Sequence, residues 1–299
     1  MPSENSISLA QHCTLPASEW RHREGAHRIR VAGHAEAFVQ RRSAGAKHPV
    51  WDFLFTYYSF SPNKLMTWCP GVGEGRQGNP DQREQEYEQE QEQEVTWMWP
   101  ALPDRIRREA AWVVQLCANI ADRPARFACH GLHEWAMVYK QSADQVRHGG
   151  YELRMSPEAL AAFVESQNIC CTHYDAFRFY TSEARPLNSF DPKFETRLEM
   201  EQGGCLHANM DLYKWAYKLW PWVGSDLVAD AFELAVFARE MDMRASPYEL
   251  TNLGFSPIRI ETEEGRVEYR ASQQELARRA EPIRERLRTA ADEVAAWGM

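Results

Sequence analysis

The chain has 299 residues, of which 44% are hydrophobic and 26% charged, and it contains eleven tryptophans. This composition excludes a disordered chain, and no run of about 18 apolar residues indicates a membrane-spanning helix. The formal net charge is −9, but residues 81–94 supply −6 of it through seven acids and one arginine. The rest of the chain is close to neutral, so its charge neither requires nor excludes a polyanionic partner.

The cysteines indicate a reducing compartment. The chain has seven of them, no CxxC pair, and no N-terminal segment typical of a signal peptide. We therefore expect free thiols in a soluble, cytoplasmic protein without a membrane partner. Neither a GxGxxG motif nor a phosphate-binding P-loop is present, which predicts no nucleotide cofactor bound by those devices.

The first half of the chain predicts helices around one polar insert. Residues 18–43 have the spacing of a surface helix, and His48 with the proline after it starts an aromatic-rich helix. The Gln/Glu-rich stretch at about 71–95 has almost nothing apolar to bury, so we expect a disordered loop. Residues 104–121 return to helical spacing, and Ser156 caps a further helix.

The second half mixes helical and strand patterns. Residues 170–180 alternate as a strand does, although their aromatic content also suits a buried helix. Helices are predicted over 193–220, with a break at Gly203 and Gly204, and from 225 to about 243. Residues 258–270 pair two alternating runs around Glu264 and Gly265, which predicts a β-hairpin.

The predicted fold class is mainly α (α+β), a single helical domain with a few short strands and a C-terminal β-hairpin plus helix. We expect an N-terminal helical segment over 1–46 and a main helical domain over 47–255 that includes the polar loop. The remaining residues, 256–299, are predicted to form the hairpin and a charged amphipathic helix packed on the main domain.

Two histidines and a glutamate stand in the apolar stretch FACHGLHEWAMVYK. If this stretch is helical, His130, His133 and Glu134 share one face, close enough to bind one ion. The order is neither HExxH nor HxxEH, so neither zinc-protease motif is present. The alternative is a buried histidine that hydrogen-bonds a nearby carboxylate.

Two further His–carboxylate pairs have spacings that suit a shared site. His173 and Asp175 lie on one face if their segment is a strand. They could then act as metal ligands, as a base with its orienting partner, or as a buried hydrogen-bonded pair. His207 and Asp211 are four residues apart on a predicted helix. Lysines continue their strip, so the alternative there is an exposed, salt-bridged face.

His48 and Asp52 form another such pair, ahead of the aromatic run FLFTYYSF. If these His–carboxylate pairs lie close together in the folded chain, they would form a pocket in which the pKa values are perturbed. Such a pocket is typical of functional sites. The cysteines near histidines are expected to be inert core thiols.

Five segments resemble a family of roughly 300-residue proteins, common in actinobacteria, whose members are usually labelled 3-methyladenine DNA glycosylase. The segments are HPVWDFLFTYYSFSP, CHGLHEWAMVY, THYDAFRFYTSEARPLN, GCLHANMDLYKWAYKL, and the stretch from DAFELA through MDMRASPYEL to IRIETEEGRVEY. The resemblance covers most of residues 47–290. It implies a DNA-repair N-glycosylase, which flips an alkylated purine into an aromatic pocket and places a carboxylate near the sugar.

The residues themselves favour a metal-dependent enzyme acting on a small organic substrate. Neutral imidazoles and carboxylates suit Fe or Zn. The hypothesis assigns His133, His173 and His207 as metal ligands, Glu134, Asp175 and Asp211 as catalytic carboxylates, and Arg178, Arg185 and His48 as substrate-binding residues. A metal-free acid–base site, base excision from nucleic acid, and a non-enzymatic ligand-binding protein remain the alternatives.

Overall fold

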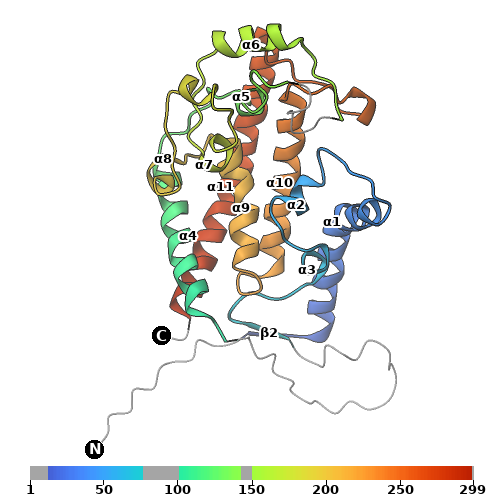
Figure 1. Ribbon diagram of the computed structural model, residues 1–299. Coiled ribbons are helices and arrows are strands. Elements are labelled where there is room, and N and C mark those ends of the chain that lie inside the picture. The colour runs from blue at the N-terminus through green and yellow to red at the C-terminus, as the bar shows by residue number, and fades with distance from the viewer. Residues whose placement is uncertain (1–12, 77–100, 143–149, 298–299) are drawn as a thin grey trace, which may run out of the picture.

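The computed structural model describes residues 13–76, 101–142 and 150–297. Within these ranges it confirms a mainly α fold, with eleven α-helices and two three-residue strands. None of the described helices combines the length and the apolar character that crossing a bilayer requires. Figure 1 shows the long helices standing side by side, with most of the short helices gathered over one end of them.

Four long helices form the central bundle. α11 (Glu263–Ala296) packs against α4 (Asp104–Asp122), α9 (Leu206–Lys218) and α10 (Ser225–Ala245), and α9 and α10 pack closely on each other. α1 (Ala17–Ser43) lies along the outside of α10 (Figure 1). The predicted helices over 18–43, 104–121 and 225–243 are thereby confirmed.

The 34-residue helix α11 is held by one narrow buried stripe. Its buried side chains recur every three or four residues, the period that keeps them on the face toward the bundle. They are Tyr269, Gln273, Leu276, Ala280, Arg284, Leu287, Ala291 and Val294. The charged side chains between them face outward, so α11 spans the bundle with few apolar residues.

The predicted C-terminal hairpin is wrong, because α11 begins inside it. The Thr262 side chain accepts a hydrogen bond from the backbone nitrogen of Gly265 at 3.0 Å and so caps the helix. Glu263 and Glu264 then occupy the first turn, where carboxylates favour the helix N-terminus. The glycine is needed for close packing rather than for a turn, since a Cβ there would collide with the backbone carbonyl of Arg259.

The other helices in the described ranges are short. Residues 170–180 form the four-residue helix α7 (Tyr174–Phe177) rather than a strand, which confirms the helical alternative. The aromatic run after His48 makes only α2 (Phe53–Thr56). The other short helices are α3 (Pro62–Met66), α5 (Leu132–Ala136), α6 (Pro157–Ser166) and α8 (Arg197–Met200), with 3-10 turns at Arg185–Leu187 and Thr251–Leu253.

The two strands pair in parallel, β1 (Cys13–Leu15) with β2 (Glu74–Arg76), in the register Cys13 opposite Glu74. β2 falls at the start of the predicted Gln/Glu-rich loop, whose residues 77–95 lie outside the described ranges. The predicted break at Gly203 and Gly204 is confirmed, because α8 ends before these glycines and α9 begins after them.

Candidate functional site

The turn before α5 directs His133 into the bundle. His130 and Gly131 both adopt positive φ, at 45° and 73°, so the chain reverses sharply before α5. A Cβ at Gly131 would approach the Tyr269 ring to 3.1 Å, so only glycine fits this turn without strain. The Trp135 indole nitrogen donates to the carbonyl of Ala245 at 2.9 Å and fastens α5 to the end of α10.

This placement pairs His133 with a carboxylate of α10. Nε2 of His133 lies 2.6 Å from Oδ1 of Asp242, and both side chains are buried. Burial alone would lower the pKa of His133, but Asp242 outweighs it and raises that pKa well above 6.5. Burial alone would raise the pKa of Asp242, but His133 holds it well below its usual range. The two groups therefore form a buried imidazolium–carboxylate pair.

Arg239 connects this pair to Glu134. One guanidinium nitrogen lies 3.0 Å from Asp242 Oδ2 and 3.3 Å from Glu134 Oε1. The same guanidinium donates to the carbonyls of Pro49 and Val50, at 3.1 and 3.3 Å. The predicted catalytic carboxylate of Glu134 is thus linked to Asp242 through the Arg239 guanidinium.

His207 lies beside His133. It is the second residue of α9, and its ring centre is 4.4 Å from that of His133. Burial first, and then the positive charge of His133, lowers the pKa of His207 from 6.5 to about 3. The imidazole is therefore neutral at pH 7, the form that ligates metals.

Three ligand atoms, one each from His133, His207 and Asp242, lie within 4.8 Å of one another. They come from α5, α9 and α10, and His207 is the partly exposed member. Two imidazoles and a carboxylate are a ligand set used by Zn and non-haem Fe. We call these residues the His/Asp triplet.

A small pocket opens beside the His/Asp triplet. Four thiols and two imidazoles dominate its walls, and among the described residues no lysine or arginine lines it. The lining residues are Cys129, His133, Cys170, Cys171, Thr172, Gln202, Cys205, Leu206 and His207. A molecule bound here would meet soft, mostly uncharged groups next to the triplet.

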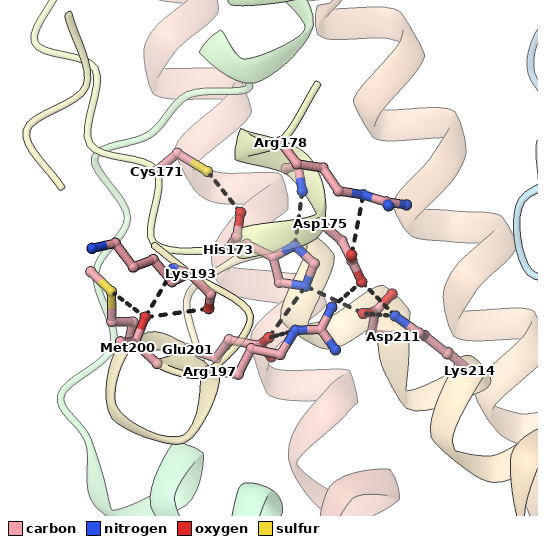
Figure 2. A network of polar contacts seen from close by, with 12 residues as sticks. Cys171, His173, Asp175, Arg178, Lys193, Arg197, Met200, Glu201, Asp211 and Lys214 are labelled. Carbon is pink, nitrogen blue, oxygen red and sulfur yellow. Dashed lines mark hydrogen bonds and ion pairs between the residues drawn. The ribbon is translucent and has the colours of Figure 1, made fainter. Parts of the chain in front are cut away.

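The ring of His173 stacks on the ring of His207. The ring centres are 5.3 Å apart and the planes are inclined by 23°. His173 caps α7, because its Nδ1 accepts a hydrogen bond from the backbone nitrogen of Ala176 at 3.3 Å. Its Nε2 points toward Asp211 and Glu201, at 3.3 and 3.7 Å (Figure 2). Both ring nitrogens thus face other partners, and His173 lies outside the triplet.

The predicted carboxylates Asp175 and Asp211 belong to a buried charge network (Figure 2). Lys214 Nζ lies 2.5 Å from Asp175 and 3.3 Å from Asp211, and Arg197 also pairs with Asp175. The Tyr58 hydroxyl donates to Asp211 at 3.1 Å. Since Asp211 is buried and the Lys214 side chain is only 14% exposed, the alternative of an exposed strip is wrong here.

Glu201 completes the network and differs from its other carboxylates. Burial raises its pKa, whereas the pKa values of Asp175 and Asp211 are lowered by their cationic neighbours despite burial. Its Oε1 lies 3.7 Å from both His173 Nε2 and Arg197 Nε. Local spacing gave no reason to single out Glu201 or Arg197 as site residues.

The predicted substrate-binding residues do not line the pocket. Arg178 lies 3.3 Å from Asp175, with its side chain 44% exposed, and Arg185 donates to the carbonyl of Arg178 at 3.0 Å. The ring of His48 accepts hydrogen bonds from the backbone nitrogens of Val50 and Trp51, both at 3.2 Å. Of the predicted site residues, only His133 and His207 border the pocket.

Sequence reasoning also missed Asp242 and Arg239. They continue a buried stripe of α10 that begins with Val228, Phe232 and Ala235, at alternating steps of four and three. A charged pair on an otherwise apolar stripe of a helix is expensive to bury unless it is partnered. A charged pair on this stripe could have identified the two residues from the sequence, but acidic residues also occur on the outer face of the same helix.

Comparisons of the chain with protein-family models, curated proteins and solved structures found no match. The geometry of the site therefore carries the functional argument.

Proposed function

We propose that this protein is a metal-dependent enzyme that acts on a small organic substrate, with His133, His207 and Asp242 as the metal ligands. The observation that carries the proposal is the approach of these three donors to within 4.8 Å, although they are far apart in the sequence. Fe and Zn are the ions that this donor set suits best. A bound ion of this kind would supply Lewis-acid or redox chemistry at the pocket.

The surroundings of the His/Asp triplet support this proposal. Asp242 is oriented by Arg239, and His207 by its stacking on His173, as outer partners orient ligands in known metal sites. The His133–Asp242 hydrogen bond is the arrangement expected without an ion. The proton of His133 must leave when a metal binds, because a ligating imidazole has to be neutral.

The first test is metal content. Purified protein, and protein reconstituted anaerobically with Fe(II) or Zn(II), would be analysed by inductively coupled plasma mass spectrometry. We expect about one tightly held ion per chain, and its loss in His207→Ala and Asp242→Asn. His130→Ala is the matched control, since His130 lies in the turn before α5 but outside the triplet. Absence of a bound ion after reconstitution would overturn the proposal.

Base excision remains the activity that the family resemblance implies. We do not favour it, because the part of the chain that the structure describes contributes no Trp, Tyr or Phe ring to the pocket on which a flipped purine would stack. An assay for release of 3-methyladenine from methylated DNA checks this choice. Release that persists after metal removal and is lost in Asp211→Asn would favour the glycosylase over the metal-dependent enzyme.

A further inference from the structure

We propose that Cys129 is a fourth ligand of the metal, so that the ion rests on two imidazoles, one carboxylate and one thiolate. This inference depends on the proposed function, because it concerns the ion held by the His/Asp triplet. It goes further in naming a residue that local sequence patterns present as an inert thiol.

The first support is the contact between Cys129 and His133. The thiol interacts with the His133 ring, and both side chains border the same small pocket. The two residues are joined by the sharp turn at His130 and Gly131, closed by a 3.0 Å hydrogen bond from the Leu132 nitrogen to the Cys129 carbonyl. The turn that directs His133 into the bundle therefore also brings the thiol to the His133 side of the triplet. Cys129 is not among the donors that lie within 4.8 Å of one another, so its sulfur would have to move toward them to complete the ligand set.

The second support is the location of the thiol. Cys129 and His207 line the same pocket, and the Cys129 side chain is only partly buried, so it borders the space in front of the triplet. Two other thiols of the pocket have structural positions. Cys171 donates to the carbonyl of His173 at 3.6 Å, and Cys205 is the buried N-terminal cap of α9.

The donor set has a chemical consequence. Thiolate is a soft ligand, and four protein donors are the number that tetrahedral Zn(II) uses, so Cys129 shifts the preference from Fe toward Zn. As the metal–sulfur bond forms, the thiol proton passes to solvent. A substrate would bind such an ion either by displacing the thiolate or by raising the coordination number to five.

The test uses Co(II) as a spectroscopic probe in the full chain. Wild-type protein loaded with Co(II) should show a near-ultraviolet sulfur-to-cobalt charge-transfer band beside the weaker visible bands. Cys129→Ser should lose the charge-transfer band while it keeps the visible bands, and should bind Zn(II) at least about tenfold more weakly. Cys170→Ser is the matched control, because Cys170 is also partly buried and lines the same pocket. The control should keep the band.

A second measurement uses only wild-type protein, so it remains informative if Cys129→Ser fails to fold. Wild-type protein is treated with iodoacetamide with and without Zn(II), and peptide mass spectrometry follows both thiols. Zn(II) should protect Cys129 and leave the alkylation of Cys170 unchanged. Bound Co(II) without a charge-transfer band, a band that survives in Cys129→Ser, or equal alkylation of Cys129 with and without Zn(II) would overturn this inference and leave the triplet as a metal site. Failure of wild-type protein to bind Co(II) or Zn(II) would overturn the proposed function as well.

Discussion

At the scale of single residues, Asp242 is the group on which the site depends most. It is fully buried and holds two cations, His133 at 2.6 Å and Arg239 at 3.0 Å. A buried charge is tolerated only when its partners are in place, and removal of one member leaves the others uncompensated. The fold and the proposed metal site therefore share this carboxylate.

Asp242→Asn is expected to lower the free energy of unfolding of the metal-free protein by about 3–5 kcal/mol, because it leaves His133 and Arg239 without their shared counter-charge. Asp230→Asn is the matched control on the same helix. Asp230 pairs with Arg30 and Arg286, but its side chain is 23% exposed and both partners are more exposed, so the loss should stay within about 1 kcal/mol. Urea denaturation followed by circular dichroism measures both, and equal losses would contradict the assignment.

Local spacing reveals some site residues but not others. His133 and His207 are recognisable because each is a histidine in an apolar segment beside another titratable group. Their actual carboxylate partner is Asp242, more than a hundred residues from His133 in the chain. Contacts of that separation depend on how α5, α9 and α10 pack, and spacing within one segment does not contain that information. For the same reason His173 and Asp175, close in sequence, face different partners.

At the scale of elements, helix ends determine where the site residues lie. α9 begins one residue before His207, and α10 ends three residues after Asp242. Helical periodicity predicts such long helices well, since it depends on their own buried stripes. It fails at α7 and at the start of α11, where alternating apolar residues suggest strands. There a capping side chain decides the structure, His173 for α7 and Thr262 for α11.

Two glycine-to-alanine substitutions test how α11 begins. Gly265→Ala should destabilise the protein by about 1–3 kcal/mol, because the new methyl group would collide with the backbone of Arg259. Gly33→Ala, in the middle of α1, meets nothing within 4 Å and should stabilise by up to about 1 kcal/mol through helix propensity. Melting temperatures from calorimetry should thus move in opposite directions. A stabilising Gly265→Ala would contradict the close approach of residues 256–262 to α11.

At the scale of the whole molecule, several histidines are held in the neutral form. Burial is the largest cause that lowers the pKa of His27, His34, His48, His130 and His207 below 6.5. Among the described histidines with a shifted pKa, His133 moves the other way, through its pairing with Asp242. The folded chain therefore resists protonation at more histidines than it favours.

Acid should destabilise the metal-free protein as the pH falls below about 6.5. In that range the unfolded chain binds protons at histidines that stay neutral when folded, so stability drops by at most about 1.4 kcal/mol per pH unit for each such histidine. His27 is a clear reporter, because it is buried far from the triplet with its Nε2 2.7 Å from the Leu65 carbonyl. His27→Gln should flatten the decline in melting temperature between pH 7 and pH 5, whereas His22→Gln, at an exposed position, should not. Parallel declines in both variants would contradict this origin of the acid sensitivity.

The antiparallel packing of α9 on α10 places His207 and Asp242 at one end of the bundle, beside α5. An ion held there would cross-link α5, α9 and α10, which otherwise contact one another through packing and hydrogen bonds. Binding of the ion would then also stabilise the fold. Because the ion is held only in the native state, the free energy of unfolding would rise with the logarithm of the free ion concentration.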